Sequence, residues 1–128
     1  FTRFTPDIVS ICLGTNDFSD GDGSVPRAPF DPALFIPAYV DFIKTVHGHY
    51  PEARIIITNT PMLDGQKNEI LMDCLQQIKT KAEASLPGLK PMYIFSFSSV
   101  YRSGCLGHPS VEEHGKMAEE FLDFLEGI

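Results

Sequence analysis

Three polar side chains stand where predicted strands end, and their types suit proton transfer and the stabilisation of an oxyanion. Asn16 and Asp17 follow the apolar run Ile8–Leu13, and His108 lies in a later loop just before a helix cap. Histidine is the usual general base near neutral pH, and an amide is a common oxyanion donor. Open α/β sheets hold ligands at the carboxyl ends of their strands. We therefore expect Asn16 and His108 on the same rim of the domain.

Each of these residues also has a structural interpretation. The segment Gly14–Asp17 reads Gly-Thr-Asn-Asp, which is good turn chemistry without any site. A loop histidine before a proline, as at His108, is more often a solvated or capping residue than a catalyst. On the residues alone, both interpretations stay open.

The remaining candidates favour structural roles. His114 lies on the apolar face of its predicted helix, so we expect a core or supporting histidine, and His47 and His49 are expected at the surface. The stretch Asp20–Ser24 hints at a calcium loop, but Val25 stands where that loop requires glycine and the closing glutamate is absent. We therefore expect a solvated loop and no metal site.

Cofactor chemistry finds no support in the sequence. No glycine-rich phosphate loop follows a predicted strand, so a nucleotide is not expected. The three cysteines are scattered and form neither a disulfide framework nor a metal spacing. Cys12 and Cys74 are interpreted as small core residues.

Strands and helices alternate along the chain and must position these residues. Apolar runs predict strands at Ile8–Leu13, Arg54–Thr60 and Met92–Phe97. The predicted helices run from the Asp31-Pro32 cap to His47-Gly48, from Lys67 to Leu86, and onward from the capping box Ser110–Glu113. We expect Pro37 to kink the first turn or delay the start of its helix. The face of the last helix is predicted from Val111, His114, Ala118, Phe121, Leu122 and Leu125.

The resulting order, βαβαβα, predicts a parallel α/β sheet. Right-handed crossovers place the first two helices on one face and leave only the last helix for the other. The run Ile8–Leu13 has the composition of a central strand buried on both faces, yet in sequence order it would be an edge. The simplest resolution is that strands are missing before Phe1. We therefore expect Ile8–Leu13 to pair with a second copy or with an amino-terminal fragment.

Length and charge exclude several function classes. The chain has 128 residues, which corresponds to a single domain, residues 1–128. A net charge of −7 argues against a nucleic-acid partner. No apolar run approaches the roughly 20 residues of a membrane span.

Three short sequence blocks, in their order along the chain, resemble the carboxyl-terminal part of SGNH (GDSL-type) hydrolases, and in particular family 2 carbohydrate esterases. The resemblance rests on Leu13–Phe18, Tyr50–Arg54 and Gly107–His114, and extends from about Phe4 to Leu125. It implies a three-layer, flavodoxin-like fold that is incomplete here. It also implies the removal of O-acetyl groups from plant polysaccharides, and hence a secreted protein.

The resemblance assigns roles to individual residues. Asn16 would donate its amide to the oxyanion and His108 would be the base for a serine nucleophile, while Gly14 and Asp17 would shape the turn. Two features depart from the family pattern. The Gly-Asp-Ser block is absent, so the nucleophile is unknown and lies outside this chain. Leu106 and Cys105 occupy the positions where an orienting aspartate often precedes the histidine.

Three hypotheses follow from the sequence. The first is an esterase that acts on acetylated polysaccharide or oligosaccharide and whose amino-terminal half is absent or cut away. The second is a non-catalytic carbohydrate-binding or interaction module that retains half of the site. The third is a flavodoxin-like domain for a nucleotide or flavin, which the missing phosphate loop disfavours.

Overall fold

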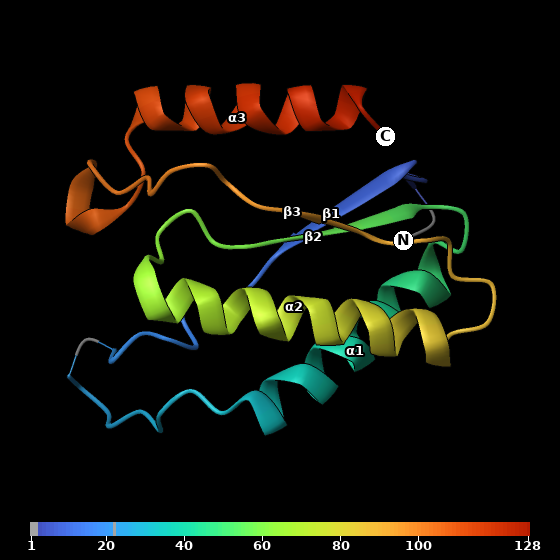
Figure 1. Cartoon of the computed structure of the whole chain (residues 1–128), viewed down its shortest axis with the longest axis horizontal. Helices are drawn as coiled ribbons and strands as arrows, with labels where there is room; N and C mark the ends of the chain where they lie inside the picture. The colour runs from blue at the N-terminus through green and yellow to red at the C-terminus, as the bar shows by residue number, and fades with distance from the viewer. Residues whose placement is uncertain (1–2, 22) are drawn as a thin grey trace.

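The computed structural model describes residues 3–21 and 23–128, and shows a parallel sheet with helices on both faces (Figure 1). Strand order in the sheet is β1-β2-β3, and both neighbouring pairs are parallel. The elements are β1 (Ile8–Cys12), α1 (Pro32–His49), β2 (Arg54–Thr58), α2 (Gly65–Ser85), β3 (Tyr93–Phe95), the short 3-10 helix η1 (Cys105–Gly107) and α3 (Val111–Glu126).

The predicted α/β class, element order and layering are therefore confirmed. α1 and α2 cover one face of the sheet and α3 lies over the other, as right-handed crossovers require (Figure 1). The described parts of residues 3–6 and of the Asp20–Ser24 loop contain no helix or strand, and Phe1, Thr2 and Asp22 lie outside the described residues.

β2 is the strand that is buried on both faces. Ile55, Ile56 and Ile57 each have no exposed surface. Ile55 and Ile57 join the core formed with α1 and α2, whereas Ile56 belongs to the opposite face. Full burial of each such side chain contributes about 1.5–3 kcal/mol, so β2 anchors both layers.

α1 begins where the sequence predicts. The Asp31 carboxylate accepts from the Ala33 N–H at 2.8 Å, and Pro32 occupies the first helical position. Of the two effects expected of Pro37, a delayed start does not occur, because the helix starts at Pro32 and includes Pro37 in its second turn. Burial of Ile36, Tyr39 and Ile43 holds this part of the helix on the core.

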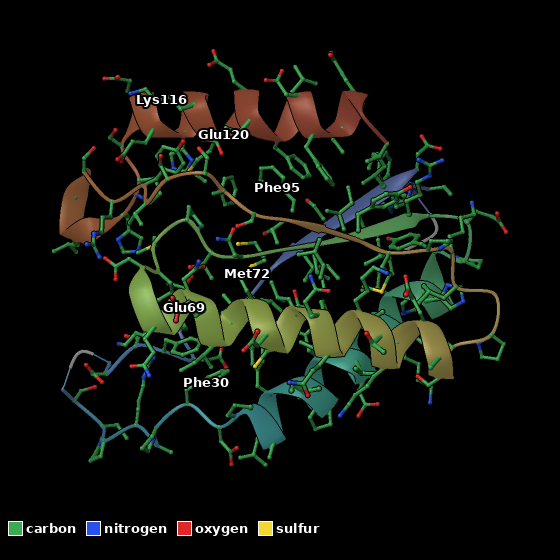
Figure 2. The ribbon with its side chains drawn as sticks, viewed as in Figure 1. Phe30, Glu69, Met72, Phe95, Lys116 and Glu120 are labelled. Atoms are coloured by element: carbon green, nitrogen blue, oxygen red, sulfur yellow. The ribbon has the colours of Figure 1, made fainter. Side chains whose placement is uncertain are left out.

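α3 packs much more lightly than the other two helices. The predicted capping box is present, with Glu113 and Ser110 each accepting the other's backbone N–H. The rings of Phe121 and Phe124 each lie 5.1 Å from the ring of Phe95, which Figure 2 shows between the sheet and α3. No side chain of α3 is fully buried.

The predicted apolar face of α3 is therefore partly wrong. Val111 is 92% exposed and Leu122 is 56% exposed, because the sheet beneath α3 is only three strands wide. An apolar helix face predicts which side of the helix can pack against a sheet. Here part of that face has no described residues to pack against.

β1 is an edge strand, and its expected burial on both faces is wrong for this chain. Ile11 points into the core formed with α1 and α2 and is only 6% exposed. Ile8, Ser10 and Cys12 alternate with it and are exposed on the other face, because α3 leaves this row uncovered. Interpreting Cys12 as a core residue was therefore wrong, whereas Cys74 is buried as expected.

Candidate functional site

The loops that carry Asn16 and His108 both leave the carboxyl end of the sheet (Figure 1). We name them the Asn16 loop (residues 13–31) and the His108 loop (residues 96–110). Both side chains are exposed. Within the described part of the chain, neither side chain has a hydrogen-bond partner, so the amide and the imidazole are free to meet a ligand.

Gly14 makes the turn that presents Asn16. Its carbonyl accepts from the N–H groups of Asp17 at 3.1 Å and Phe18 at 3.2 Å. Its φ of +122° favours glycine, and a Cβ there would lie 3.0 Å from Leu71 Cδ1. The Asp17 carboxylate is exposed, so the described contribution of Asp17 to the turn is its backbone N–H.

Two cations hold the carbonyl oxygens of this turn. Lys67 of α2 donates to the Phe18 carbonyl at 3.1 Å, and Arg27 donates to the Asn16 carbonyl at 3.0 Å. The backbone on both sides of Asp17 is thus held by one side chain from α2 and one from the same loop. No motif in the sequence predicted either contact.

A row of aromatic rings fixes the same loop to α1. Phe18 is buried and stacks on Phe30 with ring centroids 3.9 Å apart. Phe30 contacts Phe35, which meets Tyr39 edge to face at 5.5 Å. The Tyr39 hydroxyl donates to the carbonyl of Ile11 at 3.2 Å, and burial raises the pKa of Tyr39 far above its usual range, which keeps it a neutral donor. The Asn16 loop is therefore continuous with the core.

A shallow pocket opens beside Asn16. Its volume is about 390 Å³, and Asp17, Arg27, Phe30 and Leu34 are among its lining residues. An aromatic ring, an aliphatic side chain and polar groups of both charges meet there. This combination suits a small polar molecule with apolar faces.

His108 follows the single turn of η1. Its N–H donates to the Cys105 carbonyl at 3.1 Å, and its own carbonyl accepts from the Gly104 N–H at 2.8 Å. Leu106 is 91% exposed with a φ of +54°. No described residue contacts the imidazole through a hydrogen bond, and no serine is paired with it.

The carboxylate of Glu113 on α3 joins the two ends of the His108 loop. It accepts from the backbone N–H groups of Ser110 at 2.7 Å, Ser103 at 2.9 Å and Arg102 at 3.2 Å. The N–H of Ser110, together with those of Ser103 and Arg102, lowers the pKa of Glu113 to about 2. The capping box was visible in the sequence, but the bonds to Ser103 and Arg102 were not.

Two turns later on α3, Glu120 holds the start of the same loop. It accepts from the N–H and hydroxyl of Ser98 and from the hydroxyl of Tyr101 (Figure 2 labels Glu120 on α3). Tyr101 is buried, and its N–H donates to the Pro61 carbonyl at 2.7 Å. The His108 loop is therefore attached to α3 and to the segment that follows β2.

Asn59, directly after β2, braces the middle of the sheet end and was missed by the sequence analysis. It is only 3% exposed. Its side-chain oxygen accepts from the Phe97 N–H at 2.9 Å, and its amide donates to the Asn68 side chain at 3.0 Å. These bonds tie the segment after β3 to α2, so Asn59 braces the structure at this edge of the sheet.

An open groove of about 260 Å³ lies between β1 and α3. Ser10, Cys12 and Thr58 line its sheet side, and His114 and Phe121 line its helix side. The Thr58 hydroxyl is buried without a described partner. The expectation of a core His114 is therefore wrong, since its side chain is exposed in this groove. His47, expected at the surface, is half-buried, whereas His49 is exposed.

No group of three or more His, Cys, Asp or Glu side chains in the described ranges could hold a metal ion. None of the helices of residues 3–21 and 23–128 has the length and apolarity needed to cross a membrane.

Known proteins resemble this chain along almost its whole length. No family model matches it. It is 29% identical over 128 residues to an acetylxylan esterase / glucomannan deacetylase of Cellvibrio japonicus, covering 98% of this chain and 32% of that protein. It is 31% identical over 122 residues to the cellulase/esterase CelE of Acetivibrio thermocellus, covering 93% of this chain and 14% of that protein.

Solved structures show the same partial match. A family two carbohydrate esterase from Clostridium thermocellum, in complex with cellohexaose, superposes with a TM-score of 0.80 at 29% identity. The match covers 98% of this chain and 37% of that one. The chain thus spans about a third or less of the length of these relatives.

Proposed function

We propose that this chain, a homologue of the family 2 carbohydrate esterases, is the carboxyl-terminal portion of a catalytic domain that removes O-acetyl groups from plant polysaccharides. The observation that carries the proposal is the pairing of Asn16 and His108. Both side chains are exposed and have no hydrogen-bond partner among residues 3–21 and 23–128, and both follow the carboxyl end of one parallel sheet in a chain that aligns with these esterases over 98% of its length.

In the proposed reaction, a serine from outside the 128 residues attacks the acetyl carbonyl. His108 accepts the serine proton, and the amide of Asn16 donates to the oxyanion that forms. His108 then returns the proton to the departing sugar hydroxyl, which leaves an acetyl-serine. A water molecule, deprotonated by His108, attacks this ester, and the collapse releases acetate and the free serine.

The base works in this scheme without an aspartate beside it. Cys105 and Leu106 occupy the positions before His108, and Leu106 is almost fully exposed. The pair is therefore a Ser–His dyad, and the orientation of the imidazole depends on the backbone of its loop and on the missing segment.

The open edge of β1 is where we propose that the missing segment pairs. No strand of residues 3–21 and 23–128 pairs with the outer side of β1, and Ser10 and Cys12 of the exposed row Ile8, Ser10 and Cys12 line the groove under α3. A parallel strand followed by a helix would satisfy the backbone of β1 and cover that row. The segment can be covalently continuous with this chain or a separate fragment, and a second copy of the chain is the competing occupant.

Relatives supply the substrate class. One relative carries the name acetylxylan esterase / glucomannan deacetylase, and another was solved with cellohexaose. We propose acetylated polysaccharide or oligosaccharide as the substrate, with the shallow pocket beside Asn16 as the place for a sugar ring. The protein would then act outside the cell, where such polymers occur.

A non-catalytic binding module is the second candidate, and it is favoured by the lack of any serine paired with His108. One solved relative, 25% identical, is described as having an active site with divergent catalytic and non-catalytic binding functions. In this case the pocket beside Asn16 would bind sugar, and His108 would have no proton to transfer.

Turnover of 4-nitrophenyl acetate tests the proposal. The 128 residues alone should show no measurable turnover, because they lack the serine that forms the acyl-enzyme. Even an otherwise complete site keeps only about 10³–10⁴-fold acceleration over water when one triad member is removed. The same chain joined to a segment that carries the serine block should be active. In that joined protein, His108→Ala and Asn16→Ala should each lower kcat by at least ~100-fold.

Two results would overturn the proposal. One is hydrolysis by the isolated chain that His108→Ala abolishes, which would place the nucleophile inside these residues. The other is an active joined protein in which His108→Ala has no effect. Binding of cello-oligosaccharide by a joined protein without any turnover would instead establish the binding module.

A further inference from the structure

The His108 loop closes at one carboxylate. The Glu113 side chain receives the N–H of Arg102 and that of Ser103 at one end of the loop, and the N–H of Ser110 at the other. Only the bond from Ser110 belongs to the capping box. The bonds from Arg102 and Ser103 exceed what a helix cap needs, and they bring the two ends of the loop together.

Inside the loop, the backbone of His108 is fixed by residues close to these ends. Gly104, next to Ser103, donates its N–H to the His108 carbonyl at 2.8 Å. A Cβ at Gly104 would lie 2.8 Å from that carbonyl oxygen, so the backbone at Gly104 contacts the backbone at His108 and leaves no room for a side chain. The His108 N–H is held by Cys105 at 3.1 Å. The position of the His108 backbone thus depends on where Ser103 and Ser110 are held.

No described hydrogen bond fixes the His108 ring, and no carboxylate stands in the two positions before it. Within this chain, the orientation of the imidazole must therefore be set through the backbone of the His108 loop. We infer that Glu113 is the positioning residue for His108: it holds the loop in the shape that aims the imidazole at the serine. This inference rests on the proposed function and adds a residue to which neither the capping motif nor the comparisons assign such a role.

Glu113→Gln in the active joined protein tests the inference. Glutamine is accepted at this position of a capping box, so the variant keeps the helix start. Its single oxygen can replace the carboxylate oxygen that accepts from Ser103 and Ser110, but an NH₂ donor then stands where the second oxygen accepts from Arg102, and the negative charge that strengthens all three bonds is lost. We expect kcat to fall about 10- to 100-fold with KM changed less than about twofold, since small misplacements of a reacting group are costly.

Glu112→Gln is the matched control. It lies in the same turn of α3, and its described partner is Lys116 at 2.8 Å, on the solvent side. The control should keep kcat within about twofold. A purely structural role of Glu113 would instead lower the stability of both loop and helix without a selective loss of kcat.

A second readout needs no activity. In the 128-residue chain, Glu113→Gln should raise the amide hydrogen-exchange rates of Ser103 and Gly104 at least about tenfold over Glu112→Gln, because an unheld loop end opens more often. Unchanged exchange at Ser103 and Gly104 would overturn the inference.

The outcomes separate the two proposals. If His108→Ala abolishes turnover while Glu113→Gln behaves like Glu112→Gln, the inference fails and the proposed function stands. If His108→Ala leaves turnover unchanged, both proposals fall together. Loss of kcat in Glu113→Gln, with KM and the control unchanged, supports the positioning role.

Discussion

The Asn16 loop and the His108 loop end on the same rim of the sheet, but they are held in opposite ways. Cations hold the Asn16 loop by its carbonyl oxygens, through Lys67 and Arg27. A carboxylate holds the His108 loop by its N–H groups, through Glu113. The first loop is continuous with the buried core through Phe18, whereas the second is attached to α3, which has no buried side chain.

The two halves of the candidate site therefore differ in what holds them: the core holds the Asn16 loop, whereas the His108 loop depends on α3. The turn at Asn16 rests on packing that the chain completes by itself. The position of His108 rests on exposed hydrogen bonds and on a helix that borders an open groove. Residues outside the 128 that fill this groove would therefore affect the base more than the oxyanion donor.

The largest effect should come from removing the aromatic anchor of the Asn16 loop. Phe18 is 8% exposed and stacks on Phe30, so Phe18→Ala should cost about 3–5 kcal/mol of unfolding free energy. Phe121 on α3 is half-buried, and Phe121→Ala should cost only about 1–2 kcal/mol. Urea unfolding measures both. Equal losses would contradict the view that the two loops differ in their anchorage.

Two glycine substitutions test how tightly the turn of the Asn16 loop is packed. Gly14→Ala combines a positive φ with a Cβ 3.0 Å from Leu71 Cδ1, and should cost about 2–3 kcal/mol. Gly88 has a φ of +79° with open space around it, so Gly88→Ala should cost only about 1 kcal/mol, from strain alone. If the two variants unfold at the same urea concentration, the contact with Leu71 does not constrain the turn.

Acid should release the hydrogen bonds that Glu113 makes with the His108 loop. The folded pKa of Glu113 is about 2, below the ordinary 4.5, so its contribution is complete above about 4.5 and lost as pH falls through about 2. The NMR shift of the Ser103 amide should therefore titrate with a midpoint near 2, while the Phe18 amide, which donates to the Gly14 carbonyl, should show no midpoint near 2. A Ser103 midpoint near 4.5 would show that the carboxylate is not held.

The sequence predicted the layering because its signals were local. Asp31-Pro32 and Ser110 with Glu113 marked helix starts, and the β-branched run at Ile55–Ile57 marked a buried strand. The exposure of Cys12, Leu122 and His114 could not be predicted in the same way, because an apolar pattern shows which surface can be buried. Whether it is buried depends on how many strands the sheet has.

For a related reason, the sequence pointed to Asn16 and His108 as candidates but not to the residues that hold their loops. Asn16 and His108 were found because they follow strands, and strand ends share a rim. The residues that hold them act on backbone atoms across long sequence separations, as Lys67 does on Phe18. Such contacts leave no periodic signal. The two expected roles themselves stay predictions until they are tested in an active protein.

Covalent labelling tests the central claim most directly: that these residues supply a base and an oxyanion donor for a serine that lies outside them. A fluorophosphonate probe forms a stable adduct only with an activated serine, and mass spectrometry locates that adduct. The account predicts no adduct on the 128-residue chain, and one adduct on a serine of the added segment in the joined protein, lost in His108→Ala. An adduct on any serine within residues 1–128, or labelling that survives His108→Ala, would contradict it.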